Sequence, residues 1–91
     1  MSKTADRLQL MQTFIRIVEA GSLSAAARQL GTTQPTVSRR LQALEQQVGQ
    51  PLIQRSTHAL RLTETGERAL QRAKALAAEW EDFEHSLGQL V

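Results

Sequence analysis

The sequence predicts a mainly α-helical fold in which three helices and a two-stranded β-hairpin precede one long C-terminal helix. Two observations predict it. Apolar residues recur at helical spacing along most of the chain, and Gly or Pro interrupts the pattern between runs. Residues 52–63, by contrast, read as two short strands around a turn near residues 57–59. At 91 residues with 41% hydrophobic content, the chain can build one modest core.

The first helix is expected over about Asp6 to Ala20, with Gly21 ending it. Its apolar residues recur at helical spacing and are predicted to pack inward: Leu8, Met11, Phe14, Ile15 and Val18. We assign this helix a structural role, because Met and Phe at such positions are more often core residues than ligand contacts. Lys3 and Arg16 are candidates for contacts with phosphate.

A short helix, a tight turn and a second helix are predicted next. We expect Ser24 to cap a helix of small residues that runs to Leu30, and Gly31 to end that helix in the left-handed conformation. Thr33 is placed to cap the second helix, and Pro35 falls in its first turn, where the missing N–H costs nothing. Two helices separated by three residues predict a helix-turn-helix.

The second helix has one apolar stripe and one polar face. The stripe is predicted to face the core and comprises Val37, Leu41, Leu44 and Val48. At about 100° per residue, the opposite face carries Pro35, Arg39, Gln42 and Gln46, flanked by Thr36 and Ser38. Arg can grip guanine O6 and N7 and Gln can pair with adenine, so this face suits base edges. The alternative, that these side chains only solubilise the helix, leaves the capped turn unexplained.

Four segments resemble the LysR-type transcriptional regulators: FIRIVEAGSLSAAA, QPTVSR, LEQQVG and RLTETG, in that order between Phe14 and Gly66. The resemblance implies a winged helix-turn-helix, with three helices plus a two-stranded β wing, followed by a long C-terminal linker helix. We therefore expect residues 1–63 to form the DNA-binding domain and residues 64–91 the linker and dimerisation helix. In the family an effector-sensing domain follows. The chain stops at Val91, where the linker would end, so we expect the DNA-binding module without its sensor.

The hairpin at residues 52–63 is the predicted wing. Arg55 matches the family's wing arginine, which implies a position in or along the minor groove. Ile53 stands where the family usually has phenylalanine, and we expect it to hold the wing against the core. Near Thr57, His58 is either an exposed turn residue or, when protonated, a phosphate contact that strengthens DNA binding as the pH falls toward about 6.5. Equal pH dependence of binding in wild type and His58→Ala would dismiss the second possibility.

The last helix carries an apolar stripe at heptad spacing, and Thr63 is placed to cap it. The stripe comprises Ala69, Ala73, Leu76, Trp80, Phe83, Leu87 and Leu90. Near its start, Leu70, Ala73 and part of Leu76 are expected to pack onto the chain's own body. From Trp80 onward the stripe is too long for the small core to cover, so it predicts a dimer interface. The family resemblance implies antiparallel pairing of the two helices.

Charge divides the chain. Residues 1–63 hold eight basic against three acidic side chains, and residues 64–91 hold three basic against six acidic ones. The basic part is therefore the candidate DNA face. With no Cys, no apolar run of membrane-spanning length and no apolar leader, the sequence predicts a soluble intracellular protein. The family resemblance implies a cytoplasmic bacterial one. His58 and His85 are isolated and no Gly-rich phosphate loop exists, so we do not expect an enzyme.

The predicted function is sequence-specific binding of double-stranded DNA by a transcriptional regulator, as a homodimer on an inverted repeat. The alternative is a protein-interaction module that works through the helix face at residues 80–90. The residues expected to contact DNA are Ser22, Thr33, Gln34, Pro35, Thr36, Ser38, Arg39, Arg40, Gln42, Arg55, Thr57 and His58. Those expected to form the dimer are Ala73, Leu76, Trp80, Phe83, Leu87 and Leu90. We expect no metal and no cofactor, and a small-molecule effector only if the full-length protein has a sensor domain.

Overall fold

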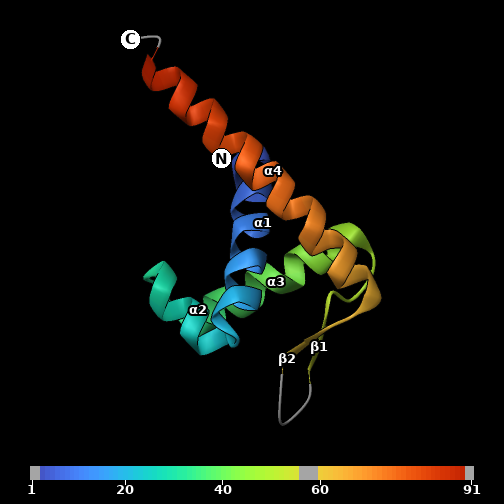
Figure 1. Cartoon of the computed structure of the whole chain (residues 1–91). Coiled ribbons are helices and arrows are strands. Elements are labelled where there is room, and N and C mark those ends of the chain that lie inside the picture. Colours follow the sequence, from blue (N-terminus) through green and yellow to red (C-terminus); the bar gives the residue numbers. More distant parts are fainter. Residues whose placement is uncertain (1–2, 56–59, 90–91) are drawn as a thin grey trace.

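The computed structural model describes residues 3–55 and 60–89, and it confirms the predicted mainly helical fold with a two-stranded wing (Figure 1). Its elements in chain order are α1 (Lys3–Ala20), α2 (Leu23–Leu30), α3 (Gln34–Val48), β1 (Ile53–Arg55), β2 (Leu60–Leu62) and α4 (Glu64–Gln89). The first helix begins at Lys3, earlier than the predicted start at Asp6.

One hydrophobic core joins α1, α2, α3 and the strand β1. Its buried residues are Phe14, Ile17, Ala26, Ala27, Val37, Leu41, Leu52 and Ile53. The two alanines of α2 have little side chain, so this helix can approach its neighbours closely. The core therefore fixes how α2 and α3, the two helices of the predicted motif, are oriented.

The buried face of α1 differs from the predicted one. Phe14 is buried as predicted, but the other buried apolar residues of the helix are Leu10 and Ile17, about one turn away on each side. The other residues predicted to pack inward, Leu8, Met11, Ile15 and Val18, are half-buried, and of these Val18 packs against the core. The first three of these line hollows that α1 shares with α4. Because α1 lies between the helix-turn-helix and α4, it buries one face fully and another partly.

Local hydrogen bonds set the ends of α2 and α3. Ser22 caps α2, because its Oγ accepts a hydrogen bond from the Ala25 N–H at 3.0 Å, so the prediction of Ser24 as the cap was wrong. Gly31 ends α2 in the left-handed conformation, with φ 67°, as predicted. Thr33 caps α3 by accepting from the N–H three residues further on, at 3.3 Å. The turn between the helices is therefore the predicted one.

The apolar stripe of α3 is buried in its first half and exposed in its last turn. Val37 and Leu41 are fully buried, and Leu44 is partly buried against the core. Val48 is 44% exposed, so its predicted core position was wrong. The helix keeps its apolar period to the end, but its last turn runs on past the core residues before the chain turns at Gly49.

The hairpin is tied to the start of α4. The two strands pair antiparallel, with Ile53 opposite Leu62. Ile53 is buried, as expected of a residue that holds the wing against the core. Thr63 caps α4: its Oγ1 accepts from the Gly66 N–H at 2.9 Å and donates to the Pro51 carbonyl at 2.7 Å. These bonds join the first turn of α4 to the segment that enters β1.

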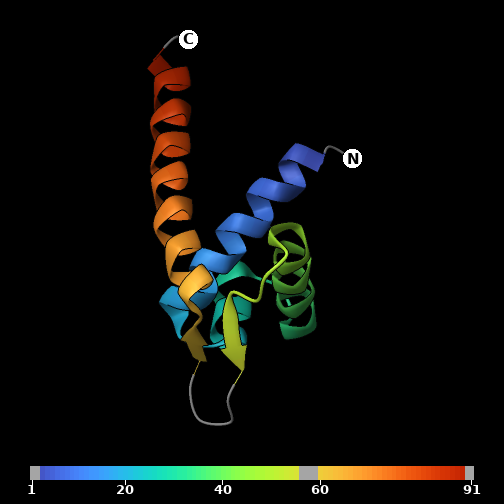
Figure 2. The same cartoon turned by 90° about the vertical axis from the view of Figure 1, so that its right-hand side faces the viewer.

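The long helix α4 packs onto the body through its first turns and then projects from it. Ala73 is buried and Leu70 packs against the core, as the sequence predicted, and Ala69 packs there as well. Leu76, part of which was also predicted to pack onto the body, is 58% exposed. Beyond the packed residues, α4 extends away from the end of the molecule that carries the hairpin (Figure 1), and α1 and α4 diverge toward that far end (Figure 2). No described helix combines the length and hydropathy that a membrane crossing requires.

Candidate nucleic-acid interface

The polar face of α3 points away from the core, as predicted. Its exposed residues are Gln34, Pro35, Arg39, Gln42 and Gln46, and its half-buried flanking residues are Thr36, Ser38 and Arg40. Val37 and Leu41 on the opposite side are fully buried, so the rotation of the helix about its axis is fixed. Amide, hydroxyl and guanidinium groups are thus presented together at the surface. These groups match the donors and acceptors of base edges in a major groove.

Three side chains at the start of α3 form a hydrogen-bonded network. The Thr33 hydroxyl donates to Thr36 Oγ1 at 3.0 Å, and it accepts the Thr36 N–H at 3.3 Å. Arg39 Nη2 donates to the same Thr36 Oγ1 at 3.3 Å. The residue spacing of three places Thr36 and Arg39 about one turn apart on one face. The cap of the helix is therefore connected to its most exposed cation through the Thr36 hydroxyl.

Ser22 takes a structural position at the start of α2. Its Oγ is engaged by the Ala25 N–H and lies 3.4 Å from the Ser24 hydroxyl. A hydroxyl has one donor and two acceptor positions, so capping does not use all of them. A contact between Ser22 and phosphate stays a prediction.

The described part of the wing carries one exposed basic side chain that is absent from the residues predicted to contact DNA. Arg61 lies on β2, is exposed and pairs with the exposed Gln54 on β1. Arg55 occupies the last described position of β1, opposite Leu60. Thr57 and His58 lie outside the described residues. Arg61 could have been found from the charge count of residues 1–63 combined with the predicted hairpin.

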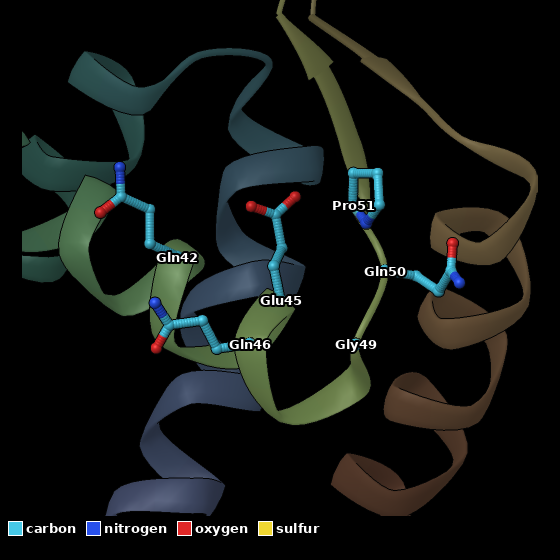
Figure 3. A pocket seen from close by; sticks show the side chains of 6 residues that line it. All are labelled: Gln42, Glu45, Gln46, Gly49, Gln50 and Pro51. Atoms are coloured by element: carbon cyan, nitrogen blue, oxygen red, sulfur yellow. The ribbon is translucent and has the colours of Figure 1, made fainter.

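Glu45 joins α3 to the wing, a role that the sequence did not reveal. Its Oε2 accepts hydrogen bonds from the backbone N–H groups of Leu52, at 2.7 Å, and Ile53, at 3.3 Å. This carboxylate lies beside a hollow of about 470 Å³ at the C-terminal half of α3. Figure 3 shows the residues that line it: Gln42, Glu45, Gln46, Gly49, Gln50 and Pro51. Within residues 3–55 and 60–89, no three His, Asp or Glu side chains are placed to share a metal ion.

A second exposed surface runs along the projecting part of α4. The exposed fractions are 58% for Leu76, 37% for Trp80, 51% for Phe83 and 44% for Leu87. The Trp80 and Phe83 rings lie 5.5 Å apart between centroids. With Leu8 and Met11 of α1, this helix lines an apolar hollow of about 330 Å³. Ala73, also predicted at the dimer interface, is buried within the chain, and Leu90 lies outside the described residues.

A comparison with protein families matches residues 8–67 to the family described as "Bacterial regulatory helix-turn-helix protein, lysR family". The matched segment contains most of α1, the whole of α2, α3 and the hairpin, and the first turn of α4. The chain belongs to the LysR family. The resemblance carried by the four sequence segments is thereby confirmed.

One curated relative of this LysR-family chain is an HTH-type transcriptional regulator of Xanthomonas campestris, 42% identical over 77 residues. The match spans 85% of the chain and 22% of the relative, so the chain spans about a fifth of that protein's length. The fold is that of LysR-family DNA-binding domains. The solved structure of the BenM DBD/catB site 1 DNA complex is similar to this chain, with a TM-score of 0.87 and 28% sequence identity. The match covers 91% of this chain and 93% of the BenM chain. The solved structure of the CbnR DBD–DNA complex is also similar, with a TM-score of 0.75 and 33% sequence identity. The match covers 89% of this chain and 97% of the CbnR chain.

Proposed function

We propose that this LysR-family chain binds double-stranded DNA in a sequence-specific manner, as the DNA-reading part of a bacterial transcriptional regulator. The exposed polar face of α3, held in a fixed rotation by the core, carries the proposal. Similarity to the BenM and CbnR domains, whose structures are described as DNA complexes, supports it. In this proposal α3 enters the major groove, and its N-terminal half, from Gln34 to Arg39, makes most base contacts.

The remaining proposed contacts surround α3. Ser22 and Thr33 lie at the starts of α2 and α3, where backbone N–H groups attract phosphate. The wing, with Arg55, Thr57 and His58, reaches the minor groove, where the negative potential favours a guanidinium. The excess of basic side chains in residues 1–63 adds an attraction that does not depend on DNA sequence.

We further propose that two copies pair through α4. Leu76, Trp80, Phe83 and Leu87 form an apolar stripe that the rest of the described chain leaves about half exposed. Because Ala73 is buried within its own chain, the interface would begin near Leu76. A two-fold dimer presents two copies of α3 to repeated half-sites, so the expected target is an inverted repeat. Residues 1–63 would then be the DNA-binding domain and residues 64–91 the dimerisation helix.

Selection from a randomised duplex pool at physiological salt tests the proposal. The wild-type chain should enrich an inverted repeat, and Arg39→Ala should lose about tenfold to a hundredfold of the preference at one position per half-site, as expected for one bidentate base contact. Arg72→Ala on the exposed face of α4 removes the same charge elsewhere and should keep the enriched sequence. Retention of DNA without enrichment would mean that binding is mainly electrostatic, contradicting sequence reading.

The second candidate function is a protein-interaction module that works through the face of α4 at residues 80–90. The exposure of Trp80 and Phe83 favours it as much as it favours a dimer. Sedimentation of wild type and Trp80→Ala separates the two possibilities. A dimer that Trp80→Ala dissociates, with a parallel loss of DNA affinity, supports the proposed dimer. A dimer unchanged by the substitution would contradict it.

A further inference from the structure

The network at the start of α3 determines which hydrogen-bonding groups face outward. A threonine hydroxyl has one donor and two acceptor positions. Thr36 Oγ1 accepts from Thr33 Oγ1 at 3.0 Å and from Arg39 Nη2 at 3.3 Å, so both acceptor positions are occupied. What Thr36 has left for an outside ligand is its O–H donor.

The same network limits the freedom of Arg39. A guanidinium carries five N–H donors in a rigid plane and no acceptor. One Nη2 donor is held by Thr36, which ties the far end of a long, exposed side chain to the helix. The other donors stay available. Holding the side chain in one arrangement before binding lowers the conformational entropy that is lost when it meets a base.

We propose that Thr36 is a positioning residue for Arg39, and that the pair presents only hydrogen-bond donors and thereby selects guanine. This inference rests on the proposed function, in which α3 lies in the major groove. Guanine offers two acceptors there, N7 and O6, whereas adenine and cytosine each present an amino donor and thymine a single acceptor. A surface that carries donors alone is therefore satisfied best by guanine. Thr33 supports the pair, because its hydroxyl caps the helix and fills one acceptor position of Thr36.

Two substitutions of one side chain separate the hydroxyl from the rest of Thr36. Thr36→Val keeps the branched shape and the backbone N–H that Thr33 caps, but it removes the acceptor for Arg39. Thr36→Ser keeps the hydroxyl and removes a methyl group. Thr32→Val removes a hydroxyl from the neighbouring turn, outside the network, and serves as the control. Thermal unfolding of all three variants measures any effect on the fold itself.

The assay measures the affinity of each variant for the duplex enriched by the wild type and for the same duplex with the Arg39-dependent base pair replaced. Thr36→Val should lower the preference for guanine about threefold to tenfold, as expected for one hydrogen bond of ordinary net strength, since solvent weakens the charge at this exposed position. Thr36→Ser and Thr32→Val should keep it. The salt dependence of binding should stay unchanged, because no phosphate contact is removed. In the Arg39→Ala background, Thr36→Val should lower this preference less than it does in the wild type, because the positioning of Arg39 can no longer be lost.

The other possible results contradict, separately, the positioning role of Thr36, the selection of guanine and the proposed function of α3. If Arg39→Ala loses the preference but Thr36→Val keeps it, Thr36 does not position Arg39, while the proposed function stands. If Thr36→Val weakens binding to both duplexes equally, its role is structural. Enrichment of adenine or cytosine at the Arg39-dependent position would contradict the statement that Thr36 and Arg39 select guanine by presenting only hydrogen-bond donors. If Arg39→Ala changes no base preference at all, α3 does not read bases through Arg39, and the proposed function of α3 is contradicted whatever the effect of Thr36→Val.

Discussion

Replacing Gly66 with Ala should destabilise the protein through one steric contact where α4 meets the hairpin. A Cβ on Gly66 would lie 2.9 Å from the Leu52 carbonyl carbon, nearer still to that group's oxygen, and 3.2 Å from Leu62 Cδ2. The blocking group is backbone. It cannot withdraw freely, because the Leu52 carbonyl accepts the Thr63 N–H at 3.0 Å. The added methyl group must therefore displace α4 or distort the segment that enters β1.

The expected size of the effect follows from these contacts. Inserting a methyl group into a closely packed site costs about 1–3 kcal/mol. Loss of the hydrogen bond between Thr63 and Leu52 would add about 1 kcal/mol. The better helix propensity of Ala offsets at most about 1 kcal/mol of this. We therefore expect a net loss of about 1–3 kcal/mol in the free energy of unfolding, which for a domain of this size lowers the thermal midpoint by about 5–20 °C.

Urea and thermal unfolding, followed by far-ultraviolet circular dichroism at one protein concentration, would measure this loss. The concentration is fixed because pairing of two chains would itself change the apparent stability. Gly88→Ala is the matched control, since Gly88 lies in the same helix and its added Cβ would meet no atom within 4 Å. That variant should be unchanged or slightly more stable. If Gly66→Ala unfolded at the same midpoint as Gly88→Ala, the close approach of α4 to residue 52 would be refuted.

Two further predictions concern hydrogen bonds that hold the helix-turn-helix and the wing. Glu45→Ala should lower the free energy of unfolding by about 1–3 kcal/mol, because two backbone N–H groups lose a charged acceptor, with Glu45→Gln intermediate; a urea midpoint equal to that of wild type would show that the carboxylate does not hold the wing. Ser22→Ala should cost about 1 kcal/mol as a lost N-cap, while Ser24→Ala should cost much less. The reverse order in thermal unfolding would restore Ser24 as the cap of α2.

The sequence determined the order and type of the elements because their signals are local. Gly31 and Thr33 mark the turn through backbone conformation and a side chain three residues from the group that it caps. The stripe at Val37 and Leu41 set which face of α3 turns inward, and so which side chains face outward. The polar face of the candidate site could therefore be predicted before any tertiary contact was known.

Tertiary structure decided what depends on neighbours far along the chain. Leu10 and Ile17, rather than Leu8 and Ile15, are the buried residues, because α1 is covered by other helices on two sides and periodicity cannot rank two apolar faces. Val48 obeys the helical period but lies past the end of the core. Glu45 reads as an ordinary surface charge until its carboxylate is seen to accept the N–H groups of residues 52 and 53.

The same distinction applies within the site. The sequence by itself determined that Thr36 and Arg39 share one face of α3, because three residues span nearly one helical turn. Only the structure decided that the Thr36 hydroxyl accepts from both Thr33 and Arg39, since this depends on the rotamers of three side chains. Periodicity fixes the direction of a side chain from its helix axis. The partners of its polar atoms are fixed by packing and hydrogen bonding in three dimensions.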